Sequence, residues 1–222
     1  MLPTIKLIVK AFFFLLESKQ MLQKVCTTLL ILLFSWPSNA LVSQVSQFSA
    51  AKVTGTGPLP YNYRIIDQTI HAGGHPLNPK KFLGNSDKQV LAILAYLKSQ
   101  GVATIIDLEN TSWAQQRYAK LLNQAGLTRV HIPMHENKVP TEKEWQIIKQ
   151  ALQKPVYVHC KWGADRTGAV IGRYLIEVKG SSLQKAYEAV LTGGSHAGPL
   201  GGLKKGKGYQ KLRDFIGQGM RE

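Results

Sequence analysis

The spacing of apolar residues between residues 61 and 191 predicts short buried strands that alternate with amphipathic helices. Apolar and β-branched runs are expected to form strands at 63–66, 69–71, 102–107, 130–133 and 155–159. Apolar positions three and four residues apart are expected to form helices at 87–100, 113–125, 142–152, 167–179 and 182–191. Such alternation favours an α/β fold in which helices flank a central, mostly parallel sheet.

Polar residues and glycines mark where these elements should begin and end. Segments 141–144 and 181–184 each place Ser or Thr three residues before Glu or Gln, which is the capping-box spacing of a helix start. The pair Gly73-Gly74 is interpreted as a turn after the second strand. Ligands of parallel sheets bind beyond the carboxyl ends of strands, and Cys160 directly follows the last predicted strand.

The first part of the chain has the pattern of an export signal. A positive charge precedes the apolar run 25–34, and small residues end at Ala40, where a signal peptidase would cleave. We interpret residues 1–40 as a signal peptide, with Met21 as an alternative start of translation, and expect a periplasmic or secreted protein. An uncleaved membrane anchor is the alternative. Residues 41–60 are expected to form a flexible linker.

The chain is strongly basic, with 28 Lys and Arg against 13 Asp and Glu and a net charge of +15. This excess favours polyanionic partners such as phosphorylated substrates or anionic lipid. No zinc-finger spacing and no basic helix with interleaved aromatics occur, so we expect no nucleic-acid partner. A folded domain at 61–195 precedes a basic segment at 196–222. The lysines of that segment are interpreted as solvated surface, with contact to an anionic membrane as the alternative.

Cysteine usage leaves one thiol in the folded part. Of the two Cys residues, Cys26 lies in the predicted signal peptide, so the mature chain would keep Cys160 alone. A single thiol cannot form an internal disulfide, which suits a group that must stay reduced to react.

The segment His159–Gly168 reads His-Cys-Lys-Trp-Gly-Ala-Asp-Arg-Thr-Gly and carries the candidate chemistry. Five residues separate Cys160 from Arg166, between a predicted strand and a predicted helix. Such a loop can wrap so that its backbone N–H groups converge on one centre, and the helix N-terminus adds the positive end of its dipole. The spacing therefore predicts a binding site for a dianion such as phosphate.

Each residue type in this loop suits that site. Arg166 offers a planar fork to two phosphate oxygens, and with the amides it should lower the pKa of Cys160 below the free-thiol value of about 8.5. Gly163 permits a tight turn, and Thr167 is expected to donate its hydroxyl to the sulfur. A nucleophile and its oxyanion cradle thus lie in one short segment.

Other loop residues are expected to contact the substrate. Gly163 and Ala164 would do so through the loop backbone. Lys161 would favour substrates that carry extra phosphates. Trp162 would either stack on an aryl or inositol ring or merely pack against the protein.

The segment His159–Gly168 resembles the signature loop of the protein tyrosine and dual-specificity phosphatase superfamily, and is most similar to small bacterial dual-specificity-like members. The resemblance implies a phosphatase domain at 61–195 that needs no metal and no cofactor. It implies that Cys160 attacks phosphorus to form a phosphocysteine, which water hydrolyses. It also implies that Arg166 binds the phosphate and that His159 supports thiolate acidity from behind.

The general acid departs from the family pattern. Members of the family bring an Asp on a mobile loop ahead of the nucleophile, but segment 135–140 contains Glu136 and no Asp. Asp165, within the cradle, is the slightly preferred candidate, and Glu136 is the rival. Asp165 could instead brace the loop, and Glu136 could instead be a solvated carboxylate.

The substrate stays open between a phosphorylated protein and a phosphorylated small molecule or lipid. A protein tyrosine or dual-specificity activity is the first hypothesis, and a phosphoinositide or inositol phosphate phosphatase is the alternative. A non-catalytic phosphate-binding module is the alternative from another class. Sulfur transfer by a rhodanese-like loop is disfavoured by His159 and by the ending Arg166-Thr167-Gly168.

Overall fold

The computed structural model describes residues 53–81, 84–135 and 137–220, which all belong to one compact unit, Ser43–Glu222. The predicted signal peptide and the rival acid Glu136 lie outside the described residues. Within the described ranges, no helix is long and apolar enough to cross a membrane.

A five-stranded sheet forms the centre of the fold, in the order β1-β2-β5-β3-β4. Its strands are β1 (Arg64–Ile66), β2 (Ile70–Gly74), β3 (Thr104–Asp107), β4 (Thr128–His131) and β5 (Val156–Cys160). Only the pairing of β1 with β2 is antiparallel; β2 with β5, β5 with β3 and β3 with β4 are parallel. The predicted α/β class with a mostly parallel sheet is therefore confirmed.

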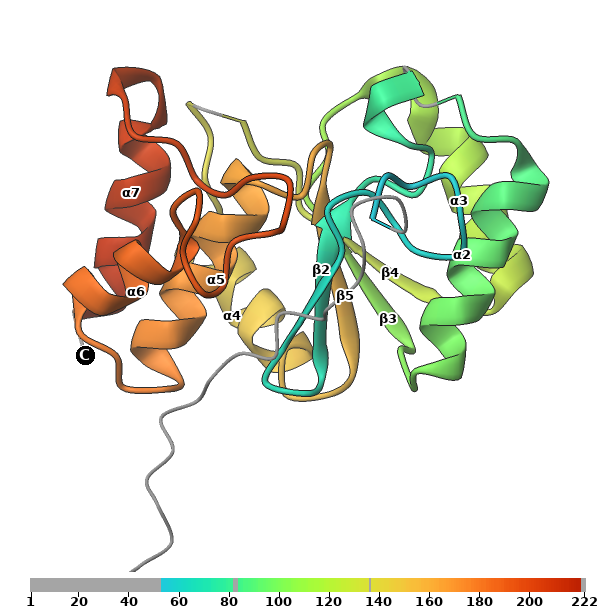
Figure 1. Cartoon of the computed structure of the whole chain (residues 1–222). Helices are drawn as coiled ribbons and strands as arrows, with labels where there is room; N and C mark the ends of the chain where they lie inside the picture. Colours follow the sequence, from blue (N-terminus) through green and yellow to red (C-terminus); the bar gives the residue numbers. More distant parts are fainter. Residues whose placement is uncertain (1–52, 82–83, 136, 221–222) are drawn as a thin grey trace, which may run out of the picture. The chain divides into compact units, whose positions relative to one another are not determined.

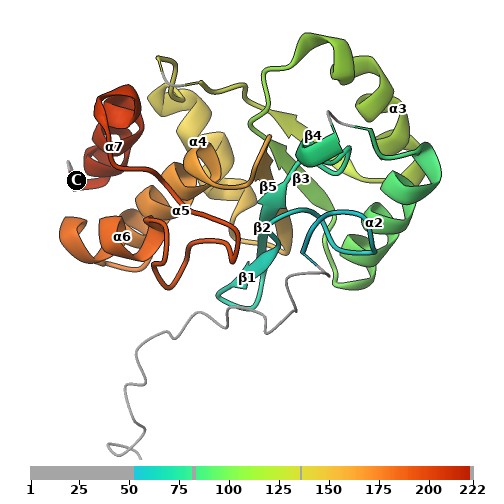
Figure 2. The same cartoon turned by 45° about the horizontal axis from the view of Figure 1, so that its top comes forward.

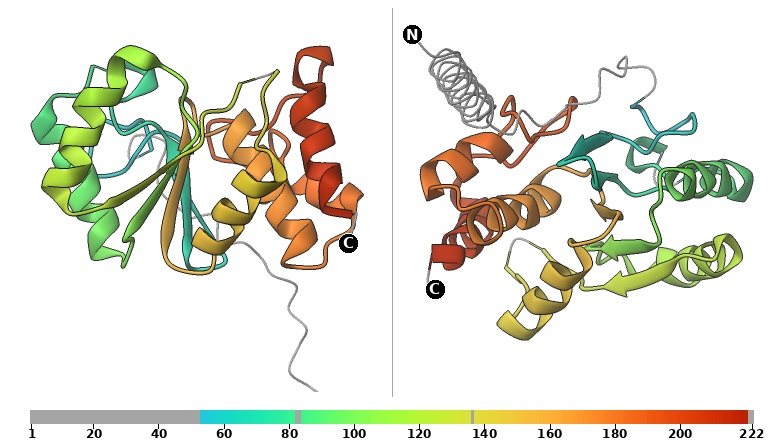
Figure 3. Two further views of the ribbon diagram at one scale, coloured as in Figure 1. Left: turned by 180° about the vertical axis from the view of Figure 1, so that it is seen from behind. Right: turned by 90° about the horizontal axis from the view of Figure 1, so that it is seen from below.

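Helices cover both faces of this sheet (Figure 1). The α-helices are α2 (Asp87–Ser99), α3 (Gln115–Ala125), α4 (Glu142–Ala151), α5 (Asp165–Glu177), α6 (Leu183–Val190) and α7 (Gln210–Gly217). Short 3-10 helices are η1 (Pro79–Lys81), η2 (Ser112–Ala114), η3 (Lys207–Tyr209) and η4 (Gln218–Met220). Helices α2 and α3 lie on one face and α4 to α7 on the other, as the views in Figures 2 and 3 also show.

Each face of the sheet has its own apolar core. One core packs α4 to α7 against the sheet and includes Val158, Trp145 and Ile171. The other packs α2 and α3 and includes Ile105, Leu94 and Leu121. The central strands β3 and β5 are buried on both faces, which explains their apolar runs, whereas the edge strand β4 is partly exposed.

Most predicted helix limits are close to the observed ones, and two are wrong. The capping box at 141–144 is present, with the Thr141 side chain accepting from the Glu144 N–H. The second box is wrong, because Ser182 and not Ser181 caps α6 and accepts from the Lys185 N–H. The predicted helix at 167–179 extends too far, because α5 ends at Glu177 and Val178, which follows it, is 43% exposed.

The predicted turn at Gly73-Gly74 is wrong, because both glycines belong to β2 and pair with His159 and Cys160 of β5. They are small because other groups approach this strand closely. A Cβ on Gly73 would lie 2.7 Å from the hydroxyl of Tyr157. Glycine here marks a crowded backbone and not a reversal of the chain.

The described part of the basic C-terminal segment contributes to the core. Leu203, Leu212, Phe215 and Ile216 are buried in the cluster that covers α5. The lysines around them are exposed, as expected of solvated surface. The segment therefore combines an apolar inner side with a basic outer side.

Candidate active site

Cys160 is the last residue of β5, and the loop 161–164 leads from it directly into α5. Its side chain is buried, with 2% of the residue exposed, and it is a free thiol. Asp165 and Arg166 form the first turn of α5. The predicted order of strand, Cys, loop and helix is thus present at the carboxyl end of a central parallel strand.

Three consecutive carbonyl groups of this loop bind partners outside it. The Lys161 oxygen accepts from the His75 N–H at 3.0 Å. Asn62 Nδ2 donates to the oxygens of Trp162 at 3.4 Å and Gly163 at 3.2 Å. In a trans peptide the C=O and the next N–H point in opposite directions. The N–H groups of residues 162–164 therefore point away from these partners, and within the described chain no acceptor binds them. Convergent free amides of this kind form an anion nest.

Gly163 is required for this loop conformation. Its φ is +66°, in the left-handed region that favours glycine. A Cβ at this position would lie 2.1 Å from the carbonyl carbon of Gly73. The sequence predicted a tight turn at Gly163, and the structure adds that the backbone of β2 fills the space beside it.

Arg166 is held in place by oxygens from two neighbouring loops. Its Nη1 donates to the carbonyls of Leu108 at 3.1 Å and Met134 at 3.0 Å. Its Nη2 pairs with Glu109 Oε2 at 3.1 Å. Burial alone would lower the pKa of Arg166, but the charges of Cys160 and Glu109 raise it above its ordinary value. Arg166 is therefore a fixed cation beside the thiol.

Glu109 is a functional candidate that the sequence reasoning missed. It is 1% exposed, and its Oε1 accepts from the N–H groups of Asn110 at 3.0 Å and Thr111 at 3.1 Å and from the Thr111 hydroxyl at 2.6 Å. Its other oxygen is thereby aimed at Arg166. An acidic residue just after the carboxyl end of a predicted central strand was the signal that could have found it.

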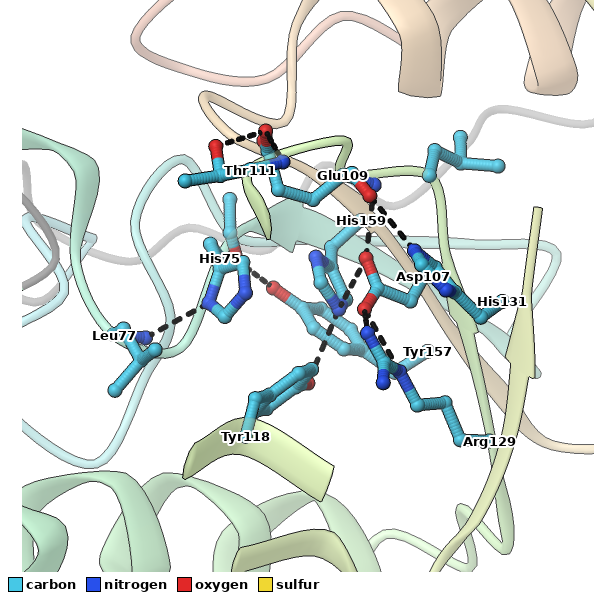
Figure 4. Close-up of polar contacts among 12 residues, drawn as sticks. His75, Leu77, Asp107, Glu109, Thr111, Tyr118, Arg129, His131, Tyr157 and His159 are labelled. Atoms are coloured by element: carbon cyan, nitrogen blue, oxygen red, sulfur yellow. Dashed lines mark hydrogen bonds and ion pairs between the residues drawn. The ribbon is translucent and has the colours of Figure 1, made fainter. Parts of the chain in front are cut away.

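A buried polar network surrounds His159, the residue before Cys160 (Figure 4). His159 Nε2 and the Tyr118 hydroxyl hydrogen-bond at 3.1 Å, and the same nitrogen lies 3.7 Å from Asp107 Oδ1. Arg129 Nε donates to Asp107 Oδ2 at 3.0 Å. Burial lowers the pKa of His159 to about 3, so its ring is neutral at ordinary pH. His159 is thus an uncharged residue directly before Cys160 in β5, and its support of thiolate acidity stays a prediction.

Asp165 is bound to the C-terminal segment. Its Oδ1 accepts from the Lys204 N–H at 2.9 Å. Burial raises the pKa of Asp165 above its ordinary value, although the Lys204 N–H acts in the opposite direction. The carboxyl group is therefore easier to protonate than a solvated Asp, and it also braces the loop.

The rival acid segment lies on the surface beside α7. His135 and Lys138 exchange backbone hydrogen bonds at 3.0 Å, and Lys211 Nζ donates to the Asn137 carbonyl at 3.2 Å. These contacts flank Glu136, which itself is outside the described residues.

The remaining predicted site residues surround the loop in different ways. Trp162 is 41% exposed, and the edge of its ring meets Tyr61 at a centroid distance of 5.6 Å. Lys161 is half-buried. Thr167 is buried, and its hydroxyl has no hydrogen-bond partner among the described residues. A buried hydroxyl without another partner leaves the predicted bond from Thr167 to the sulfur as a prediction.

Comparison with known proteins finds similarity to phosphatases. Residues 85–180 match the family profile described as "Tc-R-P: Polymorphic toxin system, DSP-PTPase phosphatase". The chain is 30% identical over 110 residues to the dual specificity protein phosphatase TpbA of Pseudomonas aeruginosa strain UCBPP-PA14, which covers 48% of this chain and 47% of TpbA. The chain thus spans about half the length of the curated relatives that it matches.

One of the similar solved structures, Tk-PTP, supports the fold. A crystal structure of Tk-PTP in the active form superimposes with a TM-score of 0.54 at 14% identity, over 72% of this chain and 98% of that chain. A crystal structure of P. aeruginosa TpbA gives a TM-score of 0.49 at 22% identity, over 71% of this chain and 84% of that chain. The resemblance carried by the signature loop is therefore confirmed over residues 85–180, which match a family of DSP-PTPase phosphatases and are similar to a dual specificity protein phosphatase.

Proposed function

We propose that this protein is a cysteine-dependent phosphomonoesterase of the protein tyrosine and dual-specificity type. The observation that carries the proposal is the position of Cys160 beside a nest of free amides and a cation, Arg166, that Glu109 holds in place. A nucleophile, an anion cradle and a charge-compensating fork together suit attack on a phosphate monoester.

The first step transfers the phosphoryl group to sulfur. Cys160 Sγ attacks phosphorus in line, the S–P bond forms and the bond from phosphorus to the leaving oxygen breaks. The leaving oxygen takes a proton from the general acid. The N–H groups of the loop and Arg166 bind the equatorial oxygens, on which negative charge accumulates in the transition state.

The second step returns the enzyme to its starting state. The deprotonated acid takes a proton from water, the water oxygen bonds to phosphorus and the P–S bond breaks. Inorganic phosphate leaves, and Cys160 is again a thiolate. Asp165 is the preferred acid because burial raises its pKa, and Glu136 is the alternative.

Turnover of an aryl phosphate by the purified domain tests this proposal. We expect the wild-type protein to release phosphate and to form a covalent phosphocysteine that rapid quenching with labelled substrate traps. Binding of phosphate or vanadate without turnover would instead identify a phosphate-binding module. Thiocyanate formation from thiosulfate and cyanide would identify sulfur transfer. Either result would overturn the proposal.

A phosphorylated protein is the first choice of substrate, since the relative TpbA is named a dual specificity protein phosphatase. A phosphoinositide or inositol phosphate is the second choice, supported by the partly exposed Lys161 and Trp162 in the loop and by the net charge of +15. Rates on a phosphotyrosine peptide, a phosphoinositide and an inositol polyphosphate, each at matched concentration, discriminate between them.

Export from the cytoplasm is part of the proposal and is supported by the sequence of residues 1–40 alone. Expression of the full chain should yield a mature N-terminus at residue 41 in the periplasm or medium. An unprocessed chain in the membrane fraction would support the anchor, and an unprocessed chain in the cytoplasm would rule out export.

A further inference from the structure

The geometry points to Arg64 and Asn62 as positioning residues of the proposed phosphatase site. They bind the Gly163 carbonyl from behind, so that the cradle is formed before an anion arrives, and Arg64 adds a buried positive charge behind Cys160. This inference rests on the proposed function and names residues that neither the signature loop nor the general-acid segment contains.

Arg64 comes from β1, and its guanidinium is directed at loop carbonyls. It is 1% exposed, and its Nη1 donates to the Gly163 oxygen at 2.6 Å. Its Nε donates to the His196 oxygen at 3.0 Å. Within the described chain no carboxylate forms an ion pair with it, and its Nη2 has no partner. Among the described residues, the charge is therefore offset by carbonyl dipoles and by the side chains of Cys160 and Tyr157.

A buried cation without a carboxylate is costly for stability, so its presence needs another reason. Burial lowers the pKa of Arg64 to about 10, while the charge of Cys160 acts to raise it. Arg64 is thus still charged at neutral pH and is electrostatically coupled to the thiol. A fixed positive charge at this place favours both the thiolate and a bound phosphate dianion.

Arg173 provides a matched comparison within the same fold. It is 2% exposed, but its guanidinium pairs with Glu177 and Glu142, each at 2.6 Å. That arginine ties α5 to α4 in the ordinary manner of a buried ion pair. The two arginines are equally buried but have different partners. Arg173 pairs with carboxylates of the core, whereas Arg64 donates to backbone carbonyls, one of them in the cradle.

Asn62 extends the support from the cradle to the C-terminal segment. It is fully buried and has a φ of +56°, a conformation that Asn tolerates better than most residues. Its Nδ2 donates to the oxygens of Gly163 at 3.2 Å and Gly201 at 3.0 Å. Its Oδ1 accepts from the Leu200 N–H at 2.7 Å. One side chain therefore joins the phosphate loop to residues 200–201.

The mechanism follows from peptide geometry. As long as the Gly163 oxygen is bound by Arg64 and Asn62, the N–H of Ala164 must point the other way. Without these donors the peptide can rotate, which would remove one N–H from the anion nest and turn a carbonyl dipole toward the phosphate. Loss of one preorganised donor at an oxyanion typically lowers the rate by about 100-fold or more.

The test compares Arg64→Met, Arg64→Lys and Asn62→Gly with Arg173→Met in the purified protein. Asn62→Gly removes the side chain and keeps access to the left-handed backbone conformation. The readouts are the Kd of vanadate, the pH dependence of Cys160 alkylation by iodoacetamide, kcat and KM on an aryl phosphate, and the Tm. The vanadate-binding and alkylation measurements do not require turnover. If Arg64→Met does not fold, Asn62→Gly still tests the inference.

We expect Arg64→Met to weaken vanadate binding by about 100-fold and to move alkylation to higher pH. Arg64→Lys should recover part of the loss, and Asn62→Gly should weaken vanadate binding by about 10-fold, as expected for one lost hydrogen bond. Arg173→Met should lower the Tm and leave the Kd and the alkylation profile unchanged.

Wild-type Kd and alkylation profiles in the Arg64 and Asn62 variants would overturn the inference and leave the phosphatase proposal intact. So would an equal loss in Arg173→Met, since that would show a general effect of core damage. A wild-type protein that neither binds vanadate nor turns over an aryl phosphate would overturn the proposed function itself.

Discussion

The two halves of the proposed site, the phosphate cradle and the proton-donating side, are supported in different ways. The cradle rests on buried groups from β1, from Asn62 just before it and from the loop after β3, which bind its carbonyls and Arg166. On the other side, Asp165 has one backbone contact to Lys204, and segment 135–140 has surface contacts. Anion binding is thus built into the rigid fold, whereas proton donation depends on peripheral segments. Substitutions of the nucleophile and of Arg166 should therefore be more damaging than substitutions on the acid side.

The largest expected effect belongs to Cys160→Ser. Because the hydroxyl is a far weaker nucleophile, turnover of an aryl phosphate should fall by at least about 10⁴-fold, and no phosphocysteine should form. Vanadate should still protect the folded variant against thermal unfolding, since the cradle remains. Turnover close to that of the wild type would contradict the assignment of the nucleophile.

Arg166→Lys should lower kcat by about 10³-fold, because an ammonium group cannot bind two phosphate oxygens as a planar fork. Glu109→Gln keeps the shape of the side chain and removes its charge, so we expect a smaller loss of about 10-fold. Steady-state kinetics on the same substrate measure both. Equal losses would show that Glu109 does more than orient Arg166.

Gly163→Ala tests the rigidity of the cradle, with Gly180→Ala as its control. Both glycines have φ near +65°, but a Cβ at Gly180 would meet nothing within 4 Å. Gly180→Ala should cost about 1 kcal/mol in the free energy of unfolding, from backbone strain alone. Gly163→Ala should cost about 3 kcal/mol, because the Cβ also collides with β2. Urea unfolding gives both values, and similar costs would argue against the close approach of β2.

Asp165→Asn and Glu136→Gln identify the proton donor. Removal of the true acid should lower kcat by about 100-fold on a phosphate with a basic leaving group, and far less on p-nitrophenyl phosphate. We expect this pattern for Asp165→Asn. Burial raises the pKa of Asp165, so the alkaline limb of its pH profile should lie above the range of a solvated Asp. The same leaving-group pattern in Glu136→Gln would transfer the role to Glu136.

The smallest effect concerns stability at acid pH. His159 has a pKa of about 3 in the folded protein and about 6.5 when unfolded. The unfolded chain therefore takes up a proton first, and stability is lost as the pH falls from about 6.5 toward 3. Between pH 7 and pH 5, the wild type should lose on the order of 2 kcal/mol more than His159→Gln. If the unfolding free energies of the wild type and of His159→Gln changed equally with pH, His159 would not be neutral and buried in the folded protein.

Local features of the sequence were sufficient for the main elements and for the reactive loop. The capping box at 141–144 and the helical spacing around Val170 depend on neighbours within two turns, so they could be identified directly. Gly73-Gly74 was misassigned as a turn because glycine permits both a reversal and a crowded strand. The hydroxyl of Tyr157, which lies beside that strand, cannot be located from local sequence.

The sequence by itself was sufficient to predict a nucleophile, a phosphate-binding arginine and the similarity to phosphatases, because the loop, its strand and its helix are contiguous in the chain. Only the tertiary structure decided what supports them. The contact from Arg64 to Gly163 spans 99 residues, and that from Asn62 to Gly201 spans 139. Such pairs have no fixed spacing, since folding of the whole sheet brings them together, and so the buried support of the cradle became visible only in three dimensions.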